Sequence, residues 1–237
     1  MYLSELFNLL STGEFSNLYV GGEDYEGIPT AEYPGVINNI NLALTDLHTR
    51  FPLIEKEVVI QQYDNITMYK LHSDFAEQNS ESTENPKYIM DTVEDPFEDI
   101  IIRIERGHQE DGTEVPLNDY GAKVSWYTPE YNTIQIPEPV GTNTAHIIYR
   151  ANHVKIPASA STDPDTTVVN LPYTFVNALL MYVAYRHYAG KPNQETQAVS
   201  ASYYQKYETA CALLRQHNVM NDGDSVTNTK LETNGWV

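Results

Sequence analysis

The sequence has little sulfur and few basic residues, and both shortages exclude classes of function. Cys211 is the one cysteine in 237 residues, so an internal disulfide and a thiolate metal cluster are excluded. Lysine and arginine number 14 against 33 acidic residues, which gives a formal net charge of -19. Because proteins bind nucleic acids mainly through Lys and Arg, this balance argues against tight binding of DNA or RNA.

Long apolar runs are also missing from the sequence. No segment approaches the roughly 20 consecutive apolar residues that a membrane-spanning helix needs, and the mean hydropathy of the chain is -0.44. The first residues, from Met1 to Phe7, lack the basic start and the small-residue cleavage site of a signal peptide. We therefore expect a protein that is made in the cytoplasm and has no membrane partner.

The residue patterns that carry most enzyme chemistry are absent. The seven histidines show no i, i+4 pair with a nearby acid, which is a usual arrangement of metal ligands. Gly21 and Gly22 precede acidic residues rather than a helix with Lys and Ser or Thr, which excludes a phosphate-binding loop. The chain has no Gly-x-Ser-x-Gly motif, and Cys211 has the place of a small buried side chain. We expect no catalytic residue, no metal and no cofactor.

The densest group of acidic residues surrounds a proline in the middle of the chain. It consists of Asp91, Glu94, Asp95, Glu98 and Asp99. Paired carboxylates hydrolyse glycosides when one of them stays protonated. A glycosidase that depends on Glu94 or Glu98 is therefore one alternative, but a solvated run of charge in a loop is the favoured interpretation.

Tyrosine is the aromatic residue that the sequence has in excess. The chain has 18 tyrosines, against 6 phenylalanines and 2 tryptophans. Tyrosine packs an apolar ring while its hydroxyl stays hydrated or hydrogen-bonded. Such side chains suit surfaces that become buried only on assembly with partners. An ordinary place at the edge of the core is an equally good interpretation for any one of them.

Two amphipathic helices are predicted in the first part of the chain. The first ends near Gly13, and its apolar face has i, i+3, i+4, i+7 spacing and consists of Leu3, Leu6, Phe7 and Leu10. The second is predicted over 34–49, where the apolar stripe consists of Ile37, Ile40, Leu44 and Leu47. Asn38, Asn39 and Asn41 are expected to face outward from this second helix.

The middle of the chain has the two-residue period of β-strands. The segments 57–63 and 67–71 flank the turn signal Asp64-Asn65 and are predicted to form a hairpin. Further strands are predicted at 100–106, 123–127, 133–136 and 145–151. Proline residues between several of these segments indicate turns or sheet edges. Together the segments indicate a small antiparallel module.

Helical patterns return near Pro172 and run to Ala189, where Gly190-Lys191-Pro192 gives a stop signal, and a last helix is predicted over 193–217. The expected class is α+β: a bundle of about four helices, interrupted by an antiparallel β insertion and followed by an extended C-terminal tail. The predicted boundaries are 1–55 for the N-terminal helices, 56–165 for the insertion, 166–218 for the C-terminal helical hairpin and 219–237 for the arm.

These C-terminal helices carry a resemblance to a known family. Residues 171–188 read LPYTFVNALLMYVAYRHY, and residues 203–207 of the next helix read YYQKY. This pair resembles the head-to-tail adaptor, or connector, proteins of tailed bacteriophages. In that family a helical bundle with a β insertion forms a ring, commonly of about twelve subunits. The ring lies below the portal protein and continues the DNA channel toward the tail.

The resemblance implies a structural virion protein at the head-to-tail interface. Its implied partners are the portal protein, a tail nozzle or tail-tube protein, and tail fibres on the outer β parts, while DNA passes through without specific binding. The candidate portal-binding residues lie in the C-terminal arm and are Val219, Val226, Leu231, Trp236 and Val237. The candidates for packing between subunits are Tyr182, Tyr185, Tyr188, Tyr203, Tyr204 and Tyr207.

A different class of function remains open for the β insertion. Trp126, Tyr127 and Tyr131 lie close together in the sequence, and aromatic side chains of this kind bind carbohydrates by stacking. A carbohydrate- or protein-binding virion module is therefore the alternative to a ring-forming adaptor.

Overall fold

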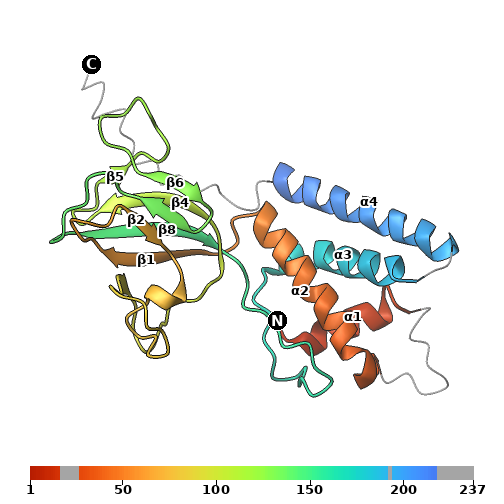
Figure 1. Cartoon of the computed structure of the whole chain (residues 1–237). Coiled ribbons are helices and arrows are strands. Elements are labelled where there is room, and N and C mark those ends of the chain that lie inside the picture. The colour runs from red at the N-terminus through yellow and green to blue at the C-terminus, as the bar shows by residue number, and fades with distance from the viewer. Residues whose placement is uncertain (17–26, 192–193, 218–237) are drawn as a thin grey trace. The chain divides into compact units, whose positions relative to one another are not determined.

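The computed structural model describes residues 1–16, 27–191 and 194–217, and the chain divides into two compact units (Figure 1). The helical unit consists of Met1–Pro52 and Lys155–Val237, and the β unit consists of Leu53–Val154. Helices, antiparallel sheets and helices follow one another along the chain. The predicted α+β class with an antiparallel insertion between two pairs of helices is therefore confirmed.

Four α-helices form the described part of the helical unit. They are α1 (Leu3–Thr12), α2 (Tyr33–Arg50), α3 (Val176–Ala189) and α4 (Gln194–Gln216). Short 3-10 helices at Thr30–Glu32 and Tyr173–Phe175 lead into α2 and α3. Helix α3 packs against each of the other three and lies among them in Figure 1, because apolar residues cover a wide arc of its surface.

Asn41 does not face outward from α2, so that prediction was wrong for this residue. Its side chain is buried, its Nδ2 donates to the Ile156 carbonyl at 2.9 Å, and its Oδ1 accepts from the Ile156 N–H at 3.0 Å. The chain returning from the insertion brings an N–H and a C=O into the core, and both need partners there. The segment 155–165, which the sequence predicts as part of the insertion, makes these and other contacts within the helical unit: the Ser4 N–H donates to the Pro164 carbonyl at 3.0 Å.

The β unit contains two antiparallel sheets. The larger has the order β3 (Ile89–Met90), β1 (Glu55–Gln61), β8 (Thr144–Ala151), β4 (Ile101–Gln109), β5 (Glu114–Val115). The smaller has the order β2 (Met68–Lys70), β7 (Thr133–Gln135), β6 (Tyr127–Glu130). A 3-10 helix occupies Ser73–Phe75 between β2 and β3. One hydrophobic core receives side chains from both sheets.

The predicted hairpin of 57–63 with 67–71 does not form. Strand β1 pairs with β8 and β3, whereas β2 pairs with β7 in the other sheet. The backbone of Tyr63, just beyond β1, bonds instead to the side chain of the buried Tyr69. The Tyr69 hydroxyl accepts from the Tyr63 N–H at 2.8 Å and donates to the Tyr63 carbonyl at 3.3 Å.

The strand predicted at 123–127 lies further along the chain, at Tyr127–Glu130. Ser125 bonds back to the Pro116 carbonyl at 2.9 Å, and Trp126 forms only an isolated bridge with Leu117. Pro129 is tolerated inside β6 because β6 is an edge strand of its sheet.

Candidate functional site

The six tyrosines predicted to pack between subunits meet one another along α3 and α4. Three of them recur every third residue of α3, and their partners follow in reverse order on the antiparallel α4. The ring-centroid distances are 5.0 Å for Tyr182–Tyr207, 5.1 Å for Tyr185–Tyr204 and 5.5 Å for Tyr188–Tyr203. We call this set the tyrosine ladder. It joins two helices of one chain, and its role between subunits stays a prediction.

Arg50 lies beside the buried end of the tyrosine ladder and ties α2 to α4. Its Nη1 and Nη2 atoms each donate to Glu208 at 2.9 Å, and its Nε lies 2.6 Å from Asp46. The guanidinium carbon is 5.1 Å from the centroid of the Tyr207 ring, and the Tyr207 hydroxyl donates to Asp46. The hydrogen bond from Arg50 lowers the pKa of Glu208. Four polar groups thus satisfy one another where two helices meet.

Cys211 is a free, buried side chain on α4, as predicted. Burial raises the pKa of its thiol above the ordinary value, so the reactive thiolate is disfavoured. Its place beside Tyr207 makes it part of the helix packing.

His187 has a pKa well below the ordinary range of histidine because its imidazole is buried. Its ring packs on Phe15 with centroids 4.6 Å apart. Burial, with a smaller contribution from the charge of Lys191, lowers the pKa of His187 to about 4. The folded chain therefore keeps this imidazole neutral at pH values at which the unfolded chain protonates it.

Lowering the pH from about 7 to about 5 is expected to destabilise the helical unit through His187. The unfolded side chain binds a proton near its ordinary pKa of about 6.5, whereas the folded one binds it only near a pKa of about 4. Between these values the unfolded state holds more protons, so stability falls as the pH falls. Urea unfolding at several pH values, followed by tyrosine near-ultraviolet circular dichroism, measures this slope. His187→Gln should make stability less dependent on pH. His217→Gln, at an exposed site, is the control and should leave this dependence unchanged. An unchanged pH dependence in His187→Gln would contradict the role given to His187.

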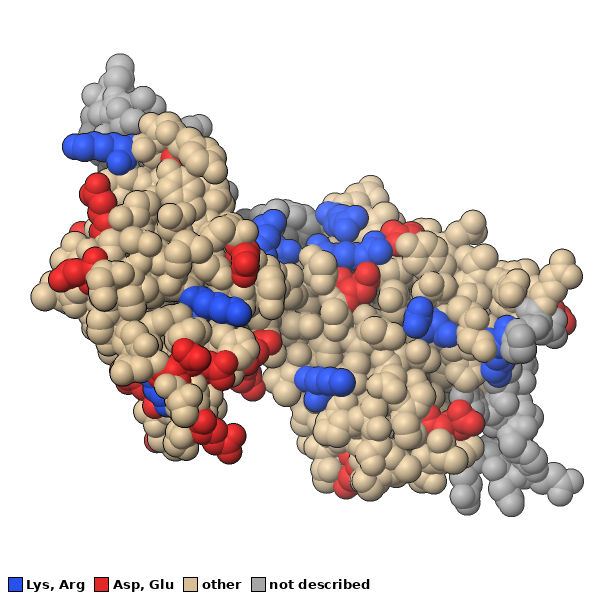
Figure 2. Space-filling model, viewed as in Figure 1, with Lys and Arg blue, Asp and Glu red and all other residues tan. Residues whose placement is uncertain are grey.

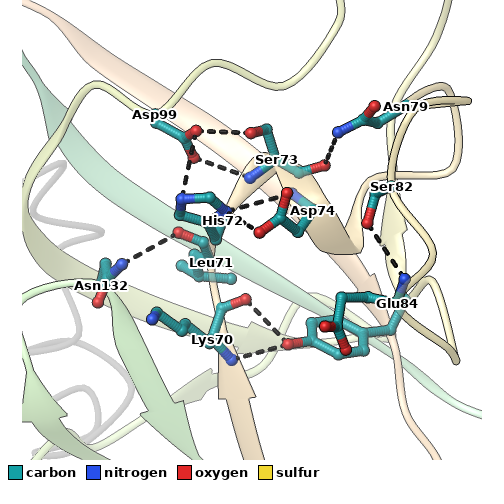
Figure 3. Close-up of polar contacts among 11 residues, drawn as sticks. Lys70, Leu71, His72, Ser73, Asp74, Asn79, Ser82, Glu84, Asp99 and Asn132 are labelled. Atoms are coloured by element: carbon teal, nitrogen blue, oxygen red, sulfur yellow. Dashed lines mark hydrogen bonds and ion pairs between the residues drawn. The ribbon is translucent and has the colours of Figure 1, made fainter.

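The acidic cluster of the β unit holds loops in place. Asp99 accepts hydrogen bonds from the Ser73 N–H at 2.8 Å and the Ser73 hydroxyl at 2.6 Å, and its Oδ2 lies 3.7 Å from His72 Nε2 (Figure 3). Asp91 accepts from the backbone N–H groups of Gln78 and Phe97, each at 3.0 Å. These bonds give both carboxylates a structural role that needs no catalysis.

The remaining acids of this cluster face solvent or a single base. Glu98 pairs with Lys56 at 3.0 Å, while Glu94 and Asp95 are exposed. Figure 2 shows acidic side chains gathered on the lower part of the β unit in that view. The arrangement fits the solvated loop that the sequence favoured.

Three findings bear on the other sequence predictions. Within residues 1–16, 27–191 and 194–217, no group of three or more His, Cys, Asp and Glu side chains has the geometry of a metal site. No helix in the described part of the chain is long and apolar enough to cross a membrane. The predicted portal-binding residues Val219, Val226, Leu231, Trp236 and Val237 lie outside the described residues.

Trp126 cannot serve as a stacking surface for a carbohydrate, which corrects that part of the alternative interpretation. Its side chain is 4% exposed and lies against Gly107 of β4. Tyr131 is exposed, and Tyr127 is half-buried with its ring 5.1 Å from that of Tyr120. Tyr120 is not among the residues predicted from the sequence, although its position between Asp119 and Gly121, two turn-forming residues, indicates an exposed loop.

Comparison with protein families places the chain in one of them. The family model described as "SU10 adaptor protein" matches residues 16–230, a range that includes the β unit and the tyrosine ladder. A search of curated proteins found no match.

Proposed function

Because the chain belongs to the SU10 adaptor protein family, whose members are structural adaptors of phage virions, we propose that it is a ring-forming head-to-tail adaptor. In this proposal the ring, of about twelve subunits, lies below the portal protein, continues the DNA channel and attaches the tail nozzle or tail-tube protein. The chain acts through extended surfaces and has no catalytic role.

The outward face of α4 supports self-association. Opposite its buried residues, this helix exposes a face without charge that runs over five turns. The face consists of Ala198, Ala201, Ser202, Gln205, Thr209, Ala212, Leu213 and Gln216. In a chain of net charge -19, so long an uncharged face is unexpected on a surface that stays in water. Interface centres are depleted of charge, and small side chains allow close approach, so a neighbouring subunit is the occupant that we propose.

The acidity of the chain fits a channel through which DNA must move. A wall rich in Lys and Arg would bind phosphates and slow the passage of DNA, whereas a negative wall repels them. The excess of 33 acidic over 14 basic residues is therefore compatible with DNA that passes without specific binding.

Electron microscopy and light scattering of the chain with its cognate portal protein test the proposal. We expect added density as a symmetric ring on the portal and a mass that corresponds to a closed set of subunits. The chain by itself can remain monomeric, because such surfaces often assemble only on their partner. Absence of any complex with the portal would overturn the proposal.

Two glutamates on the outward face of α4 are expected to prevent the ring. The double variant Ala201→Glu with Ala212→Glu puts carboxylates into every proposed subunit contact, where burying unpaired charge is costly. Its effect on folding should be small, because both positions are exposed and glutamate is a good helix former. The measurement is ring formation on the portal, together with the melting temperature of the free chain. Gln197→Glu, exposed on the flank of the same helix, is the control; a double variant that still forms rings would exclude this face from the contact.

A further inference from the structure

A shallow cavity on the β unit is rimmed by two aromatic rings. It has a volume of about 260 Å³, and its lining consists of Asn118, Tyr120, Tyr127, Thr128, Pro129 and Gln135. The lining comes from strands β6 and β7 and from the loop that precedes β6. None of these six side chains carries a charge, in a protein with 33 acidic residues. A phosphate, a carboxylate or a cation would find no countercharge there, so the cavity suits a neutral ligand.

Tyr120 is held at the surface by its own loop. The side chain is 88% exposed, which is unusual for a large aromatic residue. The loop around it is fixed on both sides, because the Asp119 N–H donates to the Ser125 hydroxyl at 3.0 Å and the Gly121 N–H donates to the Asp119 carboxylate at 2.8 Å. The ring planes of Tyr120 and Tyr127 differ by 35°, with centroids 5.1 Å apart. The fold thus presents two adjacent aromatic faces on a defined scaffold.

The floor of the cavity is also fixed. The Asn118 amide donates to the Thr128 hydroxyl at 2.8 Å and accepts from the Thr128 N–H at 3.0 Å. Asn118 adopts a φ of 56°, a left-handed conformation that asparagine tolerates better than most residues. These two hydrogen bonds anchor the loop to β6, so the cavity is formed before any ligand binds.

Several polar groups of the lining remain available to a ligand. Within the described part of the chain, the Gln135 amide and the hydroxyls of Tyr120 and Tyr127 form no hydrogen bond with another residue. Each hydroxyl can donate and accept, and the Gln135 amide supplies both two donors and an acceptor. A ligand that matches them must itself carry groups that donate and accept.

We propose that this cavity binds one neutral sugar ring of a glycan. The C–H face of the sugar packs on Tyr120 and Tyr127, and the sugar hydroxyls bond to Gln135 and the two phenol groups. A proline-rich peptide would also pack on tyrosine rings, but its prolines lack N–H donors and would leave the Gln135 carbonyl unmatched. This inference concerns the β unit alone and is independent of ring formation.

Binding of glycans to the full chain tests the inference. An array of neutral and acidic glycans, followed by titration of the neutral hits, is expected to give specific binding of neutral members. Tyr120→Ala should raise the Kd roughly tenfold, because it removes one of the two stacking rings. A tenfold change corresponds to about 1.4 kcal/mol of binding free energy. Gln135→Met keeps the volume of the side chain and removes its hydrogen bonds, so it should weaken binding while stacking remains.

Tyr131→Ala is the matched control, because Tyr131 is 64% exposed on the same unit and lies outside the lining. It should leave glycan binding unchanged. Tyr120→Ala, Gln135→Met and Tyr131→Ala should all have the melting temperature of the parent chain. No neutral hit, a preference for charged glycans, or equal binding by Tyr120→Ala and the parent would overturn the proposal. Binding of a proline-rich peptide that Tyr120→Ala abolishes, without any glycan binding, would overturn it in favour of a peptide site.

Discussion

Tyr207→Ala is expected to lower the free energy of unfolding of the helical unit by about 3–5 kcal/mol, the range for large-to-alanine changes in a core. The side chain is fully buried, and its ring lies 5.0 Å from that of Tyr182. Alanine leaves a cavity between α3 and α4. It also removes the hydroxyl that donates to Asp46 and the ring under the Arg50 guanidinium.

Hydrogen exchange measured by mass spectrometry separates this effect from the β unit, because the two units need not unfold together. Peptides from α2 and α4 should exchange faster in Tyr207→Ala, and peptides from β1 and β8 should not. Tyr204→Ala, at a position 40% exposed, is the control and should cost less. Tyr207→Phe should cost about 1.5–3 kcal/mol, because it removes only the hydrogen bond to the Asp46 carboxylate. Equal effects of Tyr207→Ala and Tyr204→Ala would contradict the packing described here.

Gly107→Ala is expected to destabilise the β unit by about 1–3 kcal/mol, as overpacked cores usually are. A Cβ atom at this position would lie 2.6 Å from Cε3 and 2.8 Å from Cζ3 of Trp126. The indole cannot move away cheaply, since its side chain is 4% exposed and its backbone bonds to Pro116 and Asn118. Either the indole or strand β4 must therefore shift.

Urea unfolding measures the loss in the free energy of unfolding, and hydrogen exchange of peptides from β4 and β8 locates it in the β unit. Gly35→Ala is the matched control, because a Cβ there meets nothing within 4 Å and Gly35 lies in helix α2. That change should leave stability unaltered or raise it by about 0.5–1 kcal/mol, the usual gain of alanine over glycine in a helix. Unaltered stability in Gly107→Ala would show that the indole has room that the structure does not give it.

The helices were predictable because their signals are local. The spacing of Leu3, Leu6, Phe7 and Leu10 repeats within one short segment and indicates α1 directly. The second helix was predicted over 34–49 and is observed as Tyr33–Arg50. Glycine and proline mark where these helices stop. Each of these signals lies within a few residues of the structure that it determines.

The prediction of strand pairing was wrong where the partner strand is distant in the sequence. The alternation at 57–63 identifies a strand but does not name its neighbour, and that neighbour is β8 rather than the next segment. The same limit applies to Asn41, since its burial depends on Ile156, far along the chain. The residues of the tyrosine ladder were visible in the sequence, but their pairing within one chain became clear only from the packed helices.

The start and the end of the β unit are hydrogen-bonded neighbours. Glu55 pairs with Arg150, and the Ala151 N–H donates to the Ile54 carbonyl at 2.9 Å. The chain therefore enters and leaves the β unit at neighbouring positions, so a short linker could join the two ends if the sheets were removed. The β unit is thus an insertion into the helical unit whose two ends lie side by side in one sheet, and its removal would leave a gap of only a few residues to bridge.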